Sequence, residues 1–400
     1  MIYSYSCKNF YSINDKVEVH FDVNAKAPTS TAYVKDAEAR LSVVEALVGP
    51  NASGKTNTVK ALAFLRHLIA EMADTDDDDD IPVSTFRNNK KPTEIEAEFS
   101  IDKRLYRYSF KLTSERILEE ELHERTQSAE RKTFKSLLSR KWVGGKYEVT
   151  STLFAIPKSF LPRRNSSLIS QVWRAYNDEE AGVILRYWRD CVITNVWVYG
   201  NRDDYDQHRL HHGDRQTKQA IRAFHDHPKL LMVAKNLLQK MDIGFFDFEE
   251  VVSAVNDTRE YRVRHSYGDE EFTLDPRYES SGTKRSILML WYILRALDQK
   301  GSIAALDEFD AYLHPDIVET LVKLFMSPVT NPKGSQLVFS SHSHQLLAEL
   351  DKQQIILVEK ADGGATDVWR LDEVTGVRAD DNYYNKYIAG AYGAKHKIEA

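Results

Sequence analysis

Alternating apolar and polar positions mark the first part of the chain as strand-forming. Residues 2–10 (IYSYSCKNF) and 17–21 (VEVHF) repeat with a period close to two, as in a strand with one buried face. Residues 41–48 (LSVVEALV) form an almost continuous apolar run, which is typical of a strand buried on both faces. Residues 56–72 then place apolar side chains at helical spacing. The pattern therefore predicts strands, a turn and a helix.

An acidic run, Asp74 and residues 76–80, separates this helix from the next strands. Consecutive like charges repel one another, so we expect a solvated loop rather than a cation site. Strand patterns then return in residues 93–102, 104–113 and 116–125. These three segments predict an antiparallel β subdomain.

The middle of the chain has a mixed pattern. We expect helices near residues 169–187 and 215–241, and we interpret residues 131–243 as a mostly helical insertion. Residues 1–130 then form an N-terminal lobe and residues 244–400 a C-terminal lobe.

Strands and helices alternate in the C-terminal lobe. After several strands we expect a helix over 281–298, a strand over 302–308, a helix from Pro315, a strand over 336–341, a helix over 344–350 and a strand over 354–360. This order predicts an α/β fold with a mixed sheet. No internal repeat occurs, and no segment is long enough for a coiled-coil arm.

Composition narrows the class of protein. The chain has 400 residues, and a hydrophobic content of 42% is enough to fill a large core. No apolar run has the length of a membrane span, and the first residues lack the pattern of a secretion signal, so we expect a cytoplasmic protein. Cys7 and Cys191 are too few for a disulfide framework or a zinc site. With a net charge of −6, any contact with nucleic acid requires a local basic patch.

Residues 49–56 (GPNASGKT) match the phosphate-binding pattern G-x-x-x-x-G-K-[ST]. The motif lies between a predicted buried strand and a predicted helix, which is the context that this loop requires. Its backbone N–H groups and the helix N-terminus attract phosphate oxygens. The binding residues predicted here are Gly49, Pro50, Asn51, Ala52, Ser53, Gly54, Lys55 and Thr56. Lys55 is expected to contact the β- and γ-phosphates of ATP, and the Thr56 hydroxyl to ligate Mg²⁺.

Two carboxylates follow the predicted strand at 302–306. Asp307 fits a group of the magnesium shell, and Glu308 fits the base that polarises the attacking water. Taken alone, an acidic pair after a strand also fits a turn. Its place downstream of a phosphate-binding loop favours the catalytic interpretation.

Two further segments complete the pattern. Residues 278–284 (YESSGTK) open a helix, where Ser280, Ser281 and Gly282 fit a γ-phosphate contact or a plain helix cap. His342 follows the strand at 336–341 and fits a γ-phosphate sensor or an ordinary histidine at a strand end.

The order of these motifs resembles the ATP-binding cassette heads of the RecF, SMC and Rad50 group. The segments GPNASGKT, ESSGTKRS, AALDEFDAYLHP and SSHS correspond to the Walker A, signature, Walker B and switch regions. The start YSCKNFYSINDKVEVHF and the tail DNYYNKYIAGAYGA are further similar to the AAA15/RloA-like ATPases. That group belongs with the overcoming-lysogenization-defect (OLD) nucleases, the PARIS and Septu defence ATPases and abortive-infection proteins.

The resemblance implies an ABC-type head that binds ATP and Mg²⁺. It implies that Ser281 and Gly282 contact the γ-phosphate of a partner subunit, that Asp310 lies between subunits, and that His342 is the switch. Two departures stand out: the signature reads SSGTK instead of SGGQ, and no Q-loop glutamine is found. Arg87 and Asn88 lie near the expected Q-loop position.

A site divided in this way requires a homodimer or higher homo-oligomer, which ATP closes and hydrolysis opens. The leading hypothesis is the ATPase subunit of an anti-phage system that controls a separately encoded effector, which we expect to be a nuclease, because few residues follow His342. A RecF-like DNA repair ATPase is the second hypothesis, and a nucleotide-held scaffold with slow ATPase is the third. DNA or a phage protein remains an open partner, and no membrane is expected. A local basic patch would draw on Arg163, Arg164, Arg186, Arg189, Arg202 and Arg215.

Overall fold

The computed structural model describes residues 1–24, 27–37, 39–126, 133–157, 159–198, 202–241, 244–252 and 259–395. Within 202–241, side chains are described from residue 214 on. No helix in these ranges has the length and apolar character needed to span a bilayer.

A six-stranded sheet forms the centre of the molecule. Its order is β11 (Val192–Thr194), β15 (Ile303–Leu306), β16 (Gln336–Ser340), β5 (Val44–Val48), β17 (Ile355–Lys360) and β18 (Thr366–Arg370). The first five strands are parallel, and β18 is antiparallel to β17. Every residue of β5, β15 and β16 is buried, which explains their continuous apolar runs. The carboxyl ends of these three strands therefore meet at one edge.

A second sheet has seven antiparallel strands and contains the predicted β subdomain. Its order is β10 (Lys146–Ser151), β9 (Phe134–Val143), β8 (Ile117–Arg125), β7 (Arg104–Leu112), β6 (Thr93–Ile101), β1 (Ile2–Lys8) and β2 (Val17–His20). The prediction that residues 131–243 are mostly helical is wrong for β9 and β10, because these two strands extend the seven-stranded sheet. Gly144 and Gly145, with φ of 58° and 85°, form the tight turn between them.

The helices fill the space around the two sheets. They are α1 (Lys55–Ala70), α2 (Leu168–Tyr176), α3 (Glu179–Arg186), α4 (Arg202–His225), α5 (Pro228–Lys240), α6 (Ser281–Leu297), α7 (Pro315–Met326) and α8 (Tyr383–Ile388), with a π-helical turn at Tyr187–Cys191. Helix α1 packs against β1 and β6 on one side and against β15 and β16 on the other. Its buried residues therefore join the cores of both sheets.

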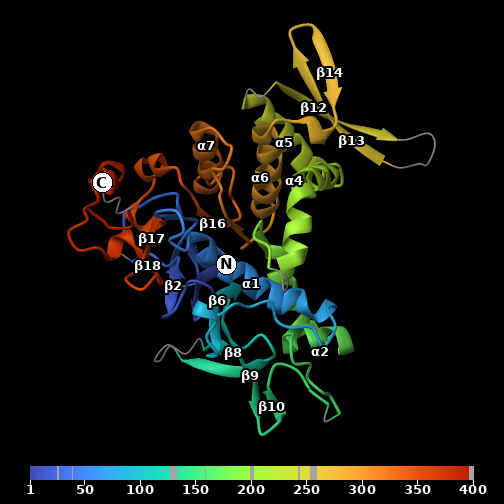
Figure 1. The fold of residues 1–400 in the computed structure, drawn as a ribbon, viewed down its shortest axis with the longest axis vertical. Helices are drawn as coiled ribbons and strands as arrows, with labels where there is room; N and C mark the ends of the chain where they lie inside the picture. Colours follow the sequence, from blue (N-terminus) through green and yellow to red (C-terminus); the bar gives the residue numbers. More distant parts are fainter. Residues whose placement is uncertain are drawn as a thin grey trace.

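The remaining strands form smaller sheets. A three-stranded sheet of β12 (Phe245–Val252), β13 (Arg259–Tyr267) and β14 (Glu270–Leu274) projects beyond α4, α5 and α6, and the seven-stranded sheet lies at the opposite end (Figure 1). Strands β3 (Tyr33–Asp36) and β4 (Ala39–Ser42) form a hairpin. The mixed α/β class with an antiparallel subdomain is confirmed.

Three predicted helices differ from the observed ones. The helix predicted over 169–187 breaks at Asn177, which has a left-handed φ of 50°, and Asp178 caps the next helix. The helix predicted over 215–241 breaks before Pro228, because proline cannot donate the backbone bond of a helix interior. Residues 344–350 form only a 3₁₀ turn at His344–Ala348.

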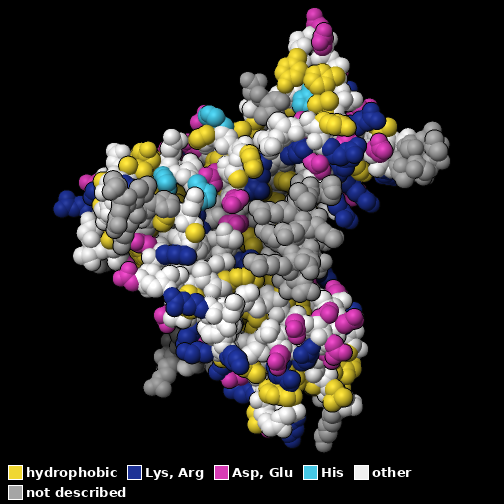
Figure 2. Space-filling model, viewed as in Figure 1, with side chains coloured by type: hydrophobic (Ala, Val, Ile, Leu, Met, Phe, Trp, Pro, Cys, Tyr) yellow, Lys and Arg dark blue, Asp and Glu magenta, His cyan; other side chains and the backbone are white. Residues whose placement is uncertain are grey.

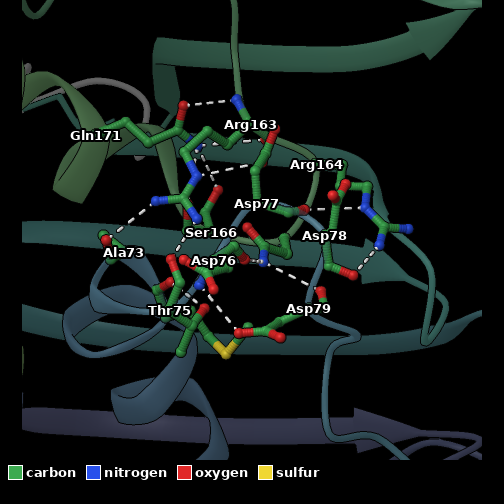
Figure 3. A network of polar contacts seen from close by, with 12 residues as sticks. Ala73, Thr75, Asp76, Asp77, Asp78, Asp79, Arg163, Arg164, Ser166 and Gln171 are labelled. Carbon is green, nitrogen blue, oxygen red and sulfur yellow. Dashed lines mark hydrogen bonds and ion pairs between the residues drawn. The ribbon is translucent and has the colours of Figure 1, made fainter.

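The acidic run is an exposed turn, as predicted, and two arginines hold it (Figure 3). Arg163 donates to the Thr75 carbonyl oxygen and pairs with Asp77 at 3.2 Å. Arg164 donates to the carbonyl oxygens of Asp77, at 3.1 Å, and Asp78. Both guanidinium groups therefore bond to the acidic turn, and Arg163 and Arg164 do not contribute to the basic patch for nucleic acid that the sequence suggested.

Candidate nucleotide site

The phosphate-binding loop connects β5 to α1, and close packing requires both of its glycines. A Cβ on Gly49 would lie 2.0 Å from the Val358 carbonyl oxygen in β17. Gly54 has a φ of 114°, and a Cβ there would lie 2.0 Å from the Thr366 Oγ1. Asn51 and Ala52 are exposed at the tip of the loop. Any larger residue at either glycine would displace the loop from the sheet.

Lys55 folds back over this loop. Its Nζ donates to the carbonyl oxygens of Gly49 and Pro50, at 2.8 and 2.9 Å. Burial lowers the pKa of Lys55, and the nearby carboxylates, Asp307 foremost, oppose that effect. The ammonium group is therefore placed in the curve of the loop, where a phosphate would replace the two carbonyl contacts.

Side chains distant in sequence brace the loop. Thr366 Oγ1, at the start of β18, donates to the Ser53 carbonyl oxygen at 2.7 Å and lies 2.7 Å from Ser12 Oγ. Asn57 Nδ2 donates to the same Ser12 oxygen at 2.7 Å. Among the described residues, the buried Ser53 Oγ has no hydrogen-bond partner. An unsatisfied hydroxyl beside a curved backbone suits a phosphate oxygen, so the loop fits ATP.

The Ser340 hydroxyl contacts both residues of the predicted carboxylate pair, Asp307 and Glu308. Strands β15 and β16 pair in parallel, so the last residue of β16 lies next to the residues after β15. The Ser340 hydroxyl lies 2.5 Å from Asp307 Oδ1 and accepts from the Glu308 backbone N–H at 2.8 Å. Glu308 has a φ of 47° and an exposed side chain. The Glu308 carboxylate is therefore accessible to water.

Two more residues hold the backbone of Asp307 and Glu308 through hydrogen bonds. Asn195, just after β11, donates to the Asp307 carbonyl oxygen at 2.9 Å and accepts from its N–H at 2.8 Å. Arg285 on α6 donates to the carbonyl oxygens of Asp307 and Glu308, at 3.1 and 2.5 Å. Sequence reasoning missed both residues, because neither belongs to a local motif.

His342 lies exposed on the loop after β16. Its backbone N–H donates to both carboxylate oxygens of Asp310, at 3.2 and 3.0 Å. Asp310 thus contacts the switch loop of its own chain. A second histidine, His344, is half-buried nearby, and its ring centroid is 4.8 Å from that of Tyr387. Burial and then the charge of Lys55 lower the pKa of His344, which places this histidine near the loop as well.

The signature residues begin α6, beside the segment that follows β15. Ser280 caps α6 by accepting from the Thr283 N–H at 3.1 Å, and Ser280 and Ser281 are exposed. A Cβ on Gly282 would lie 3.2 Å from the Tyr312 carbonyl oxygen. In the described part of the chain, no hydrogen bond joins Ser280, Ser281 or Gly282 to the phosphate-binding loop. The first turn of a long helix is therefore exposed, with hydroxyl and N–H donors facing outward.

The segment near the expected Q-loop position supplies no glutamine. Arg87 and Asn88 form an exposed turn with positive φ, and Arg87 donates to the Gly363 carbonyl oxygen.

Thr56, the predicted magnesium ligand of the phosphate-binding loop, is exposed in the first turn of α1.

Residues 45–348, from β5 to beyond His342, match the protein family described as “AAA domain, putative AbiEii toxin, Type IV TA system”. The chain belongs to this family. The match spans the Walker A, signature, Walker B and switch segments, and it leaves out the start of the chain and the tail at residues 381–394. Membership in an AAA-domain family agrees with a phosphate-binding loop suited to ATP, and such families generally bind ATP with Mg²⁺. No curated protein matches this AAA-domain chain.

Solved structures of SMC heads are similar over most of this AAA-domain chain. One is the SMC head bound to the C-winged helix domain of ScpA, with 16% identity, a TM-score of 0.48, and coverage of 93% of this chain and 99% of that one. The SMC head domain from Thermotoga maritima has 14% identity, a TM-score of 0.43, and coverage of 92% and 98%. The Smc head with an extended coiled coil, bound to a ScpA domain derived from Pyrococcus furiosus, has 15% identity, a TM-score of 0.47, and coverage of 93% and 97%. These scores are low, so the assignment rests on the family match and on the geometry of the site.

We expect Ser340→Ala to lower the ATPase kcat of this AAA-domain protein. The change removes the hydroxyl that contacts the Asp307 carboxylate and the Glu308 N–H. Hydrogen bonds to charged groups contribute about 1.5–3 kcal/mol, so kcat should fall roughly 10- to 100-fold in a phosphate-release assay. Ser335→Ala, just before the same strand, removes a buried hydroxyl that bonds the Ala296 carbonyl oxygen and is the matched control. Equal losses in both variants would show a general structural effect.

Proposed function

We propose that this chain is an ATP-dependent switch whose working form is a dimer with ATP held between subunits. One observation carries the proposal: the phosphate-binding loop, Asp307, Glu308 and His342 gather at one sheet edge, and the exposed signature residues of α6 make no hydrogen bond to that loop within the part of the chain that the structure describes. A second copy would supply that turn to the bound γ-phosphate. The donors of Ser281 and Gly282 would then complete a site that one subunit leaves open.

Within this site each residue has a distinct role. The Thr56 hydroxyl and the Asp307 carboxylate are the hard oxygen donors that Mg²⁺ prefers, and the metal would neutralise phosphate charge. Lys55 would hold the β- and γ-phosphates. Glu308 would accept a proton from the attacking water, and His342 would contact the γ-phosphate and respond to its loss. Binding would close the dimer, and hydrolysis would release it.

The switch controls a separately encoded effector in defence against phage, and that effector is a nuclease. The family description supports the link to defence, because it names the AbiEii toxin and a type IV toxin–antitoxin system, but it names no nuclease. The similarity of the motifs to AAA15/RloA-like ATPases supports it as well. In this account the protein works in the cytoplasm, and the ATP-bound dimer is the state that the effector recognises.

Phage challenge of a host that carries the native locus tests this role. Wild-type protein should lower the efficiency of plating, and Lys55→Ala and Glu308→Gln should each restore plaques, because binding and hydrolysis are both needed. Lack of protection by the wild-type locus against a broad phage panel would contradict the defence role. Full protection by Glu308→Gln would favour the third hypothesis, a nucleotide-held scaffold.

One observation favours DNA binding as a second candidate function. Where α4 approaches β13, a 440 Å³ groove is lined by Arg215, Lys218, Arg222, Arg259 and Arg277, and also by Asp214 and Glu260. Lys218 and Arg277 both pair with Asp275, so Arg215 and Arg222 contribute most to a basic surface here. Figure 2 shows Lys and Arg side chains gathered in this region. The side chain of Arg202, considered for a basic patch, lies outside the described residues. Salt-dependent affinity for duplex DNA, with replication or repair genes adjacent, would favour this candidate.

A further inference from the structure

A cavity of 570 Å³ lies apart from the phosphate-binding loop, since no residue of that loop lines it. Its walls come from the C-terminal half of α1, the segment around β11, α4 and α6. Arg66 on α1 lines it, eleven residues after Lys55, which is about 16 Å along a helix. The volume is in the range of small-molecule sites, and the position separates this cavity from the phosphate-binding loop.

Arginines dominate the charge of this cavity. Arg66, Arg189 and Arg295 line it together with His67, and Glu71 is the acidic residue among the lining groups. Glu71 is already engaged: although burial acts to raise its pKa, the hydrogen bond with His67 and the charge of Arg66 lower it to about 2. Its carboxylate is therefore engaged by Arg66 and His67 on α1, and three arginines face one carboxylate in the cavity.

Arg295 is the unpaired one of these three arginines among the described residues. Arg66 pairs with Glu71, and Arg189 pairs with Asp190 at 3.0 Å. Arg295 is half-buried on α6 and makes no hydrogen bond or ion pair with any residue that the structure describes. Asp190, which pairs with Arg189, acts on Arg295 through its charge without contacting it. A half-buried guanidinium group without a contacting carboxylate is unfavourable. An anion in the cavity would supply the missing partner.

The other walls suit a flat ring. Trp291 and Tyr292 on α6 and Trp197 after β11 line the cavity with aromatic side chains. Gln216 and Gln219 on α4 add amide groups that can both donate and accept hydrogen bonds. Aromatic faces with amide groups recognise a nucleobase, and an arginine recognises a phosphate.

We propose that this cavity binds a free nucleoside phosphate, with Arg295 on the phosphate and the base against Trp291. The site is distinct from the ATP site and is connected to it. Thr194 and Val196 line the cavity, and Asn195 between them makes both hydrogen bonds to the Asp307 backbone. A ligand that shifts this segment would move Asp307 and change the ATPase rate.

Calorimetric titration in a Lys55→Ala background tests the proposal with AMP, GMP, CMP and UMP as separate probes. At least one should bind, and Arg295→Met should weaken that binding at least tenfold. The matched control is Arg186→Met, on α3 outside the cavity, which should leave the affinity unchanged. No binding of any probe at millimolar concentration, or equal affinity in the Arg295 and Arg186 variants, would overturn the proposal.

Thermal unfolding separates a binding role of Arg295 from a structural one. Methionine keeps the apolar stem and removes the unpaired charge, so Arg295→Met should melt at or above the wild-type temperature while it loses nucleotide. Arg295→Lys keeps the charge and should retain part of the affinity. A melting temperature of Arg295→Met clearly below that of Arg186→Met would show a structural role and overturn the proposal.

Discussion

Glu308→Gln is expected to lower kcat for ATP hydrolysis by about 10²- to 10⁴-fold, the usual contribution of a general base. Glutamine keeps the size of the side chain and the backbone contact with Ser340, but its amide cannot accept the proton of the attacking water. ATP affinity should stay within a few-fold of wild type, because Glu308 is exposed and has no role in holding the phosphates. Phosphate release and nucleotide titration measure the two quantities separately.

The control for this variant is Glu319→Gln on α7, which removes an exposed carboxylate that pairs with Lys323. It should leave kcat unchanged. If Glu308→Gln keeps wild-type kcat, the base lies elsewhere, and the assignment of the Walker B pair fails.

Lys55→Ala is expected to weaken ATP binding roughly 10- to 100-fold or more, the value of a charge-assisted hydrogen bond to phosphate. Its Nζ is bound to the Gly49 and Pro50 carbonyl oxygens and buried in the loop, so no other cation can take its position. Equilibrium binding of ATP with Mg²⁺ measures the loss.

Lys60→Ala is the matched control for this second variant. Lys60 is a further α1 lysine whose pKa burial lowers, and its Nζ lies 4.5 Å from the centre of the Tyr11 ring. Its loss changes the net charge equally and should leave ATP affinity nearly intact. Unchanged ATP binding by Lys55→Ala would exclude the loop as the phosphate site.

The local motifs of the site were predictable from sequence because each is a strand, a turn and a helix in direct succession. The loop at 49–56 and the carboxylates after β15 are of this kind. The residues that fix them were not predictable. Asn195, Ser340 and Thr366 reach the site only because β11, β16 and β18 take their places in the sheet, and strand order is not contained in local spacing.

The errors in the middle of the chain have a similar origin. Apolar spacing continues across Asn177 and Pro228, so periodicity alone joined helices that backbone geometry separates. Strand β11 has three residues, too few to show a period, yet it forms the sheet edge beside β15. The glycine pair at 144–145 is typical of a β-hairpin turn, and the interpretation of residues 131–243 as helical did not take it into account. The division of the chain into three domains stays a prediction.

Sedimentation of Glu308→Gln with ATP and Mg²⁺ tests the divided site most directly. We predict a dimer with ATP and a monomer with ADP, because in the proposed site the intact γ-phosphate would link the loop of one subunit to the signature turn of the other. Adding Ser281→Arg to the same chain should abolish the dimer, since a bulky cation would then block that turn. A monomer at all ATP concentrations, or an equally stable dimer in the Ser281→Arg variant, would contradict a nucleotide site shared between two subunits.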